Sequence, residues 1–200
     1  MKRFLIGLLV LSVLSCSQKE KLLGDTEWQK QMNADFKDAS KSPLKKKDLK
    51  SFKALDFFPF DSSYVVKASL EKTPNSEWFE MKTTTGDVNI ERVYGVLSFN
   101  LKGKTFKLNS YVGEESMQMG RFGSYKLFLP FLDDTNGSST YAGGRYIDLM
   151  TPEGDSIEID FNKAYNPYCA YNEKYSCPIV PRENYVPIKI EAGLKNFKKH

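Results

Sequence analysis

The chain has 200 residues, of which 40% are hydrophobic, and a formal net charge of +4 at pH 7. Roughly 175 residues remain after an N-terminal leader is set aside, which is enough for one domain with a real core. Removing Lys2 and Arg3 of that leader lowers the charge from +4 to +2. So small a balance excludes a nucleic-acid binder on charge grounds, and we interpret the basic run in PLKKKDLKSFK as a solvated face near an anionic bilayer.

The first residues, MKRFLIGLLVLSVLSC, are typical of a secretory leader. Two basic residues precede an apolar run from Phe4 to Leu14 that is shorter than the ~20 residues a bilayer-spanning helix needs. We therefore predict a signal peptide over residues 1–15 rather than a membrane-spanning anchor.

The residues before Cys16 resemble a bacterial lipobox, although Val13 stands where leucine is preferred. The pattern predicts that Cys16 becomes the first mature residue and carries lipid, with palmitate among its acyl chains; an ordinary secretory signal is the alternative. Several acyl chains make membrane anchoring stable. We expect residues 16–24 to be a lipidated tether and residues 25–200 to be a single β-rich domain in the bacterial cell envelope. The outer membrane, on its periplasmic or surface side, is the expected location.

An amphipathic helix is predicted from Asp25 to Ala39, because Trp28, Met32 and Phe36 recur every four residues. Asp25 or Thr26 can cap it, and Ser42-Pro43 would end it. We interpret the apolar stripe as core packing rather than a cofactor site. A short second helix is expected within LKKKDLKSF.

From there on, the patterns favour β-strands. SSYVVKASLEK alternates and SEWFEMKTT follows it, while ERVYGVLSFNLKGKTFKLNSYV predicts a hairpin that turns at Lys102-Gly103-Lys104. Pro130 makes SYKLFLPFL an edge or bulged strand. GRYIDLMTPEGDSIEIDFN is predicted to form a second hairpin, and NYVPIKIEAGL a last strand with Ile188 and Ile190 inward. The fold class expected is mainly β (α+β): a small antiparallel β-barrel or split-barrel-like domain, or a sandwich, after one N-terminal helix.

Several kinds of chemistry are excluded. The one histidine is His200, the last residue, so an oriented Ser-His-Asp or Cys-His arrangement is not expected. No zinc-binding set is present, GKT lacks the earlier glycine of a phosphate loop, and LDDTNGSST lacks calcium-loop spacing; no metal site is predicted. Asp148, Glu158 and Asp160 could supply paired carboxylates on neighbouring hairpin strands, but ordinary exposed acidic residues are the preferred interpretation.

Three stretches carry a resemblance to a known family. They are SPLKKKDLKSFKALDFFPFDSSYVV, LFLPFLDDTNGSSTYAGGRYIDL and IDFNKAYNPYCAYNEKYSCPIVPRENYVPIKIEAGLK. Together they resemble the bacterial envelope-lipoprotein family catalogued as domain of unknown function 1684. The resemblance implies a small β-barrel with a distant relation to FMN-binding split barrels, which makes FMN a candidate cofactor. It implies no catalytic residue.

Arg145 is the most informative of the polar residues in these stretches. Its guanidinium could anchor an acidic ligand, or it could form an internal pair with Asp160 or Glu183. The asparagines are interpreted first as side chains that hold turns. We list as ligand-binding candidates Arg145, Tyr146, Asp148, Asp160, Asn162, Tyr165, Asn166, Arg182, Glu183 and Asn184.

Cys169 and Cys177 are separated by seven residues. In an oxidising envelope compartment a disulfide is the expected state. A redox-active pair is the alternative, but such pairs usually keep two residues between the cysteines. The disulfide would hold the loop in one shape and present Tyr165, Asn166 and the Arg182-Glu183 pair towards Arg145.

Three functions remain open. The first is a lipid-anchored module that binds a small polar or acidic ligand, and the second is an interaction or assembly factor that contacts another envelope protein. The third is an enzyme, either a split-barrel flavin-dependent oxidoreductase or a hydrolase, although no nucleophile and base are visible. The expected partners are therefore the membrane, through the lipid, and a small ligand or an envelope protein, but no nucleic acid.

Overall fold

The computed structural model describes residues 23–120 and 124–197. The predicted signal peptide, Cys16 and most of the tether lie outside these residues. The described helices are α1 (Glu27–Lys37), α2 (Lys46–Ser51) and α3 (Glu114–Met119), with short 3-10 turns at Ser62–Tyr64, Phe161–Lys163, Tyr168–Ala170 and Arg182–Asn184. The strands are β1 (Val65–Lys72), β2 (Phe79–Lys82), β3 (Val88–Leu101), β4 (Lys104–Gly113), β5 (Lys126–Asp133), β6 (Arg145–Met150), β7 (Ser156–Asp160) and β8 (Tyr185–Val186).

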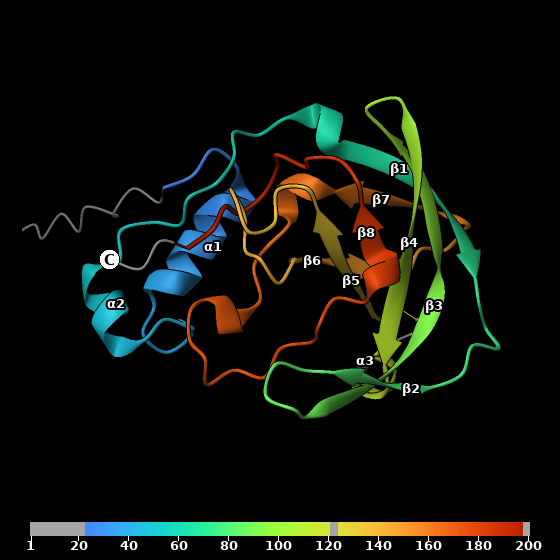
Figure 1. Ribbon diagram of the computed structural model, residues 1–200, viewed down its shortest axis with the longest axis horizontal. Coiled ribbons are helices and arrows are strands. Elements are labelled where there is room, and N and C mark those ends of the chain that lie inside the picture. The colour runs from blue at the N-terminus through green and yellow to red at the C-terminus, as the bar shows by residue number, and fades with distance from the viewer. Residues whose placement is uncertain (1–22, 121–123, 198–200) are drawn as a thin grey trace, which may run out of the picture.

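One curled sheet dominates the molecule (Figure 1). Its strand order is β6-β5-β4-β3-β1-β7, with β2 added beside β3 and β8 beside β5. All pairings are antiparallel except β5 with β8. The sheet curls into a half-barrel, which confirms the predicted mainly β, barrel-like fold class.

The hairpin of β3 and β4 is confirmed. Leu101 pairs with Lys104 across a two-residue turn in which Lys102 (φ 50°) and Gly103 (φ 76°) both adopt the left-handed conformation. Turns of this kind match the right-handed twist of the flanking strands. The register then continues from Leu101 back to Glu91, with one irregularity between Val93 and Gly95.

The predicted hairpin of β6 with β7 is wrong. β6 pairs with β5, and β7 pairs with β1 at the opposite end of the strand order. The outer edge of β6 is occupied instead by Tyr165, whose N–H and carbonyl exchange two hydrogen bonds with the backbone of Tyr146. Asp148 and the two acids of β7, Glu158 and Asp160, are therefore not on neighbouring strands, which removes the basis for pairing them.

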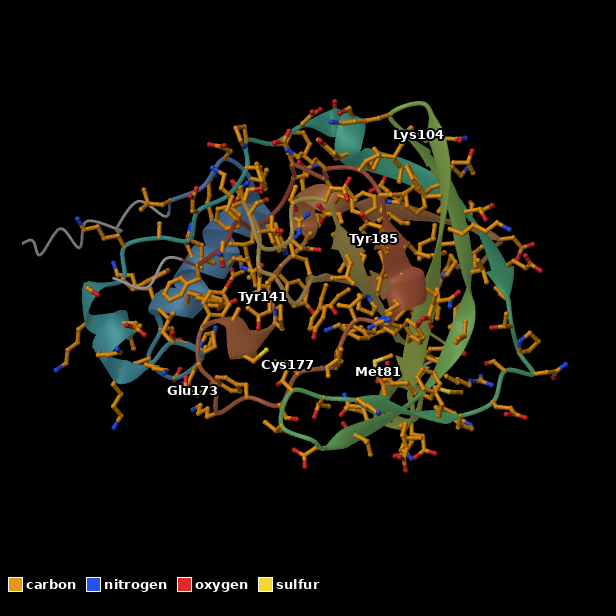
Figure 2. The ribbon with its side chains drawn as sticks, in the orientation of Figure 1. Met81, Lys104, Tyr141, Glu173, Cys177 and Tyr185 are labelled. Atoms are coloured by element: carbon orange, nitrogen blue, oxygen red, sulfur yellow. The ribbon has the colours of Figure 1, made fainter. Side chains whose placement is uncertain are left out.

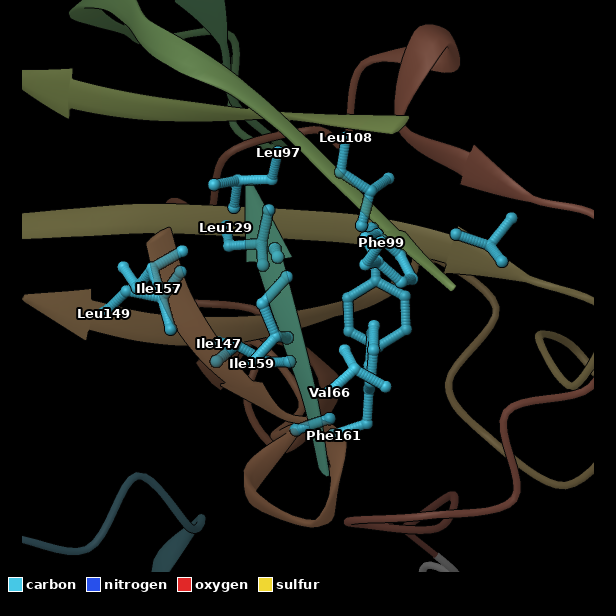
Figure 3. Close-up of a cluster of buried hydrophobic side chains, with 14 of the residues drawn as sticks. Val66, Leu97, Phe99, Leu108, Leu129, Ile147, Leu149, Ile157, Ile159 and Phe161 are labelled. Atoms are coloured by element: carbon cyan, nitrogen blue, oxygen red, sulfur yellow. The ribbon is translucent and has the colours of Figure 1, made fainter. Parts of the chain in front are cut away.

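The main core fills the concave side of the sheet (Figure 3). Alternate residues of β1 and of β7 point into it, as the two-residue period predicts: they are Val66, Ala68, Leu70, Ile157 and Ile159, all 9% exposed or less. Within it, the Phe161 ring contacts the rings of Phe99 and Phe131.

A second, smaller core lies under α1, which has the predicted capping. Thr26 accepts a hydrogen bond from the Gln29 N–H, and the Gln29 side chain accepts from the Thr26 N–H. Phe36 is 3% exposed and packs with Tyr171 from the late loop. The helix ends at Lys37, two residues before the predicted end at Ala39. Its other two stripe residues, Trp28 and Met32, are only partly buried.

β5 lies inside the strand order, so of the two predicted alternatives, an edge strand or a bulged one, the edge position is wrong. Pro130 is tolerated there because β4 and β5 meet at one residue pair, Tyr111 with Phe128, and then separate. Beyond that point the Asn184 side chain bridges them. It accepts from the Asn109 N–H and donates to the carbonyls of Asn109 and Pro130. The missing N–H of Pro130 therefore leaves no ladder hydrogen bond unmade.

The last strand is shorter than predicted, because β8 covers only Tyr185 and Val186 before Pro187. Ile190 is fully buried as expected, whereas Ile188 is half-buried.

Candidate functional site

Arg145 binds within the chain. Its side chain is fully buried, and Nη2 donates to the Asp133 carboxylate at 2.7 Å and to the Ile190 carbonyl at 2.8 Å. Nη1 donates to the Ala192 carbonyl. The internal pair that the sequence left open thus exists, but with Asp133 in place of Asp160 or Glu183. Burial lowers the pKa of Arg145, and the adjacent Asp133 carboxylate opposes that effect.

The three asparagine candidates also hold the backbone. Asn162 is 4% exposed and exchanges two hydrogen bonds with the backbone of Asp61. Asn166 donates to the Lys195 carbonyl and to the Tyr171 hydroxyl, and Asn184 bridges β4 and β5 as described above. These contacts join segments up to 101 residues apart in the sequence.

The remaining polar candidates lie in three places. Asp160 caps the turn at Phe161–Lys163 by accepting from the Asn162 N–H. Glu183 accepts from the Tyr111 hydroxyl at 3.4 Å, and Arg182 is exposed. Tyr146, Asp148 and Tyr165 lie elsewhere, in a large cleft.

This cleft, with a volume of about 870 Å³, lies on the outer side of the sheet. The N-terminal part of α1, the start of β3, α3, parts of β5 and β6, and the late tyrosine-rich loop form its walls. We call it the outer cleft. It is lined by Trp28, Met32, Val88, Asn89, Ile90, Glu91, Gly113, Glu114, Glu115, Ser116, Met119, Lys126, Leu127, Phe128, Tyr146, Asp148, Tyr165, Pro167, Tyr168, Tyr175, Ser176, Cys177 and Pro178.

The strand register explains why these side chains converge. Paired residues of antiparallel strands share a face, as do residues two apart on one strand. Tyr111 pairs with Phe128, which pairs with Asp148, and Glu91 pairs with Gly113, two residues after Tyr111. Glu91 and Asp148 therefore share the outer face, on strands that are three steps apart in the strand order. They lie on opposite walls of the cleft.

One wall is aromatic. The Phe128 and Tyr146 ring centroids lie 4.7 Å apart in an edge-to-face arrangement, and those of Tyr146 and Tyr165 lie 5.9 Å apart. Tyr168 and Tyr175, on the loop, contact each other at 5.3 Å. The wall is held firmly, because edge-to-face contacts of this kind stabilise beyond their buried area and the Tyr146 hydroxyl donates to the Pro178 carbonyl.

Asp148 is already bound by two donors. The Tyr165 hydroxyl donates to it at 2.9 Å, and Lys126 Nζ lies 2.8 Å from its other oxygen. Burial raises the pKa of Tyr165, and the negative charge of Asp148 adds to that effect. The phenol therefore stays protonated at neutral pH and keeps donating.

Glu91 is the residue that sequence reasoning missed. Burial raises the pKa of its carboxyl from 4.5 to about 7, and no hydrogen-bond partner within residues 23–120 and 124–197 reaches its enclosed Oε2. A Cβ added at Gly113 would meet this carboxylate at 3.0 Å, so the glycine makes room for it. Nothing in the stretch VNIERVYGV distinguishes Glu91 from an exposed acid on a strand, since the partner strands that bury it lie elsewhere in the sequence.

The cysteine pair lies beside the outer cleft. The structure describes both as unbonded thiols, with the Cys169 N–H donating to Cys177 Sγ at 3.1 Å and the Tyr141 hydroxyl 3.8 Å from Cys169 Sγ. Figure 2 shows Tyr141 and Cys177 in the same part of the molecule. A hydrogen bond with Cys177 lowers the pKa of Cys169 to about 6, whereas the same contact raises that of Cys177. The predicted disulfide stays a prediction.

The charges of the outer cleft do not fit a flavin mononucleotide. Its phosphate needs cationic donors, and the described lining has one, Lys126, which is engaged by Asp148. Four carboxylates face the same space: Glu91, Glu114, Glu115 and Asp148. Across the described ranges, no three histidine, cysteine or acidic side chains gather as metal ligands would.

Comparison with known proteins places the chain. The family model described as "Protein of unknown function (DUF1684)" matches residues 50–195. The chain belongs to this family. The match covers every described strand and the loop with both cysteines, as the resemblance of the three stretches implied.

A solved structure is also similar. The solution NMR structure of the uncharacterized protein from gene locus rrnAC0354 of Haloarcula marismortui matches with a TM-score of 0.66 and 30% identity, over 86% of this chain and 92% of that one. No curated protein matches the chain. Among the helices of the described residues, none has the length and apolar character needed to span a membrane.

Proposed function

We propose that this DUF1684 protein is a lipid-anchored domain of the bacterial cell envelope that binds a small organic ligand in the outer cleft. The observation that carries the proposal is the cleft itself. Its volume of about 870 Å³ is within the range of about 300–1,000 Å³ typical of small-molecule sites, and such sites combine aromatic walls with a few convergent polar groups.

The outer cleft replaces Arg145 as the site. The three charged or polar groups that Arg145 contacts belong to the chain, and its remaining nitrogen, Nε, is enclosed. Tyr146, Asp148 and Tyr165 keep their place among the candidates, and Glu91, Phe128 and Tyr168 join them.

The anchor is proposed from the leader sequence. The nine residues of the tether, 16–24, span at most about 30 Å when extended. Since α1 begins at Glu27 and places Trp28 and Met32 in the wall of the outer cleft, the cleft would open within that distance of the bilayer surface.

Binding can be tested with a panel of metabolites and glycans, measured by thermal shift and ligand-observed NMR. Tyr168 is 46% exposed and lines the cleft, whereas Tyr185 is 48% exposed and does not. For any ligand found, we expect Tyr168→Ala to weaken binding about fivefold to tenfold, the usual effect of a lost aromatic contact, and Tyr185→Ala to leave it unchanged. A panel without a binder, or equal effects of both variants, would count against the cleft.

A contact surface for another envelope protein is the second candidate. Apolar side chains stand exposed around the mouth of the outer cleft: Val88 43%, Ile90 39%, Met119 74% and Tyr168 46%. Contiguous exposed apolar groups often mark interaction sites. A photo-crosslinker placed at Met119 in intact cells should capture a defined protein partner, and the same crosslinker at Met150 should not.

A further inference from the structure

The outer cleft carries an excess of negative charge within its described lining. Four carboxylates face one lysine, and that lysine already pairs with Asp148. Field lines focus in a cleft with low-dielectric walls, so the local concentration of cations is raised there. An anionic ligand is disfavoured by the same field.

Glu91 lacks the donor that a buried carboxylate requires. Its Oε2 is enclosed and has no hydrogen-bond partner among the residues that the structure describes, and buried polar groups are normally satisfied. The strand partner on one side, Phe79, has no donor in its side chain, and on the other side is Gly113. The missing donor can therefore come from a molecule that enters the cleft.

The aromatic wall suits an organic body next to a cation. Phe128, Tyr146 and Tyr165 form a continuous set of ring contacts, and Tyr168 adds an exposed ring at the mouth. Ring faces attract cations within about 6 Å as well as apolar groups. Carboxylates combined with such rings favour ammonium and guanidinium groups over a plain hydrocarbon.

We infer that the outer cleft takes an organic cation, with an amine or guanidinium head bound by Glu91 and an apolar or aromatic body against the ring wall. This inference rests on the proposed function and specifies the chemical class of its ligand. The head would donate to the Glu91 carboxylate, and the ionised form of that carboxylate would supply the counter-charge.

The inference has a pH signature. Because the pKa of Glu91 is about 7, its carboxylate is about one-tenth ionised at pH 6 and about nine-tenths ionised at pH 8, and an alkylamine stays protonated throughout. Affinity for a cation should therefore rise about tenfold as pH rises from 6 to 8. The other titratable groups facing the cleft are Glu114, Glu115, Lys126, Asp148, Tyr146, Tyr165, Tyr168, Tyr175 and Cys177; none is named among the causes of the Glu91 shift.

The test uses 2-phenylethylamine as probe and 2-phenylethanol as its uncharged analogue. The native lipoprotein is placed in phosphatidylcholine nanodiscs, and ligand-observed NMR titrations are corrected with empty nanodiscs. We expect the amine to bind more tightly than the alcohol at pH 8 and about tenfold more weakly at pH 6. Glu91→Gln should lower the affinity for the amine about tenfold and remove its pH dependence. Glu80 is an exposed acid on the neighbouring strand β2. Glu80→Gln should change neither the affinity for the amine nor the pH dependence of that affinity.

Equal binding of the amine and the alcohol, or an affinity for the amine that does not depend on pH, would overturn the inference and leave ligand binding in the cleft intact. The pH dependence of amine binding is measured on the unmodified protein. It therefore tests the inference even if the Glu91→Gln variant fails to fold. Absence of amine binding overturns the inference too, while the metabolite panel with Tyr168→Ala tests the proposed function separately.

Discussion

Buried polar side chains of this domain bind other parts of the same chain. Arg145, Asn162 and Asn184 are 4% exposed or less, and each of them joins segments distant in sequence. Among the described residues with an enclosed polar atom that lacks a hydrogen-bond partner, Glu91 lines the outer cleft. A polar residue in one of the distinctive sequence stretches is therefore not necessarily a ligand contact. Whether it binds the chain or a ligand depends on where its hydrogen-bond partners lie.

Arg145→Met should destabilise the protein by about 3–5 kcal/mol, because it leaves the Asp133 carboxylate buried without its cation. Both side chains are fully enclosed, with 0% side-chain exposure. Urea denaturation measures the loss. Arg182→Met, at an exposed arginine, should stay within about 0.5 kcal/mol. A cost for Arg145→Met below 1 kcal/mol would contradict the role assigned to this ion pair.

Glu91 should make stability depend on pH. Its pKa is about 7 in the folded protein against 4.5 for the free group, so the folded state binds the proton more tightly. The stabilisation that this tighter proton binding gives the folded state is fully present below pH 4.5 and is lost as the pH rises through 7. Since solvent partly screens this carboxyl, we expect a loss of roughly 1–2 kcal/mol between pH 4.5 and 8. Urea denaturation gives the free energy of unfolding of the unmodified protein and of Glu91→Gln. The difference between these two free energies should change between pH 4.5 and 8. A difference in unfolding free energy that stays constant over this pH range would refute the predicted role of Glu91.

At the scale of elements, side chains replace strand pairing where the curled sheet cannot continue. β4 and β5 meet at one residue pair, and the Asn184 amide then bridges the gap that opens between them. On the far side of β5, the edge of β6 is completed by Tyr165 from the late loop rather than by β7. The late loop is thus part of the sheet, which gives a physical reason for its unusual composition.

Asn184→Ala should cost about 3 kcal/mol, because three hydrogen bonds are lost and their backbone partners remain buried. Chemical denaturation gives the value, and hydrogen exchange should show faster exchange at the Asn109 amide. Asn100→Ala, at an exposed position of β3 bonded to the Thr105 side chain, is the matched control with little effect. Similar costs for the two variants would show that Asn184 is no bridge.

The cysteines define the other element-scale prediction. If Cys169 and Cys177 are joined in the envelope, non-reducing mass spectrometry of the isolated protein finds no free thiol at either position. Reduction should then lower stability by about 2–3 kcal/mol, and a Cys169→Ser, Cys177→Ser double variant should not respond to reductant. After reduction, iodoacetamide at pH 7 should modify Cys169 first, because the pKa of its thiol is about 6 and the thiolate is the nucleophile. Free thiols in the native protein would refute the disulfide.

For the whole molecule, the curled sheet separates two environments. Its concave side holds the main core, and its outer side, closed off by α1, α3 and the late loop, forms the outer cleft. The lipid anchor proposed at Cys16 would attach just before α1, which forms one wall of that cleft. The anchor would then be attached next to a helix that forms part of the binding site.

Cys16→Ser should release the protein from the membrane. The thiol is the predicted acylation site, and a protein without acyl chains loses stable anchoring. Fractionation of cells should move the protein from the membrane to the soluble envelope fraction, with loss of incorporated radiolabelled palmitate. Ser15→Ala is the neighbouring control and should stay in the membrane fraction. Membrane retention of the Cys16→Ser protein would exclude the lipid anchor.

Much of the fold could be predicted because its causes are local. Three predicted features depend only on residues close together in the sequence: the stripe of Trp28, Met32 and Phe36, the cap at Thr26, and the turn at Lys102-Gly103. The β6–β7 pairing failed for the opposite reason, since a turn between two strands does not require that they pair. The candidate site was partly found: Tyr146, Asp148 and Tyr165 line the outer cleft, whereas Glu91 could not be recognised.

The sequence by itself determined that this chain forms strands after an amphipathic helix and that it belongs with the DUF1684 proteins, because periodicity and distinctive strings are properties of contiguous residues. Only the tertiary structure decided which polar residues bind the chain and which are left for a ligand. That choice depends on burial and on partners up to 101 residues away. It enclosed Arg145 with Asp133, and it placed Glu91 in the wall of a cleft with no hydrogen-bond partner for its Oε2 in the described part of the chain.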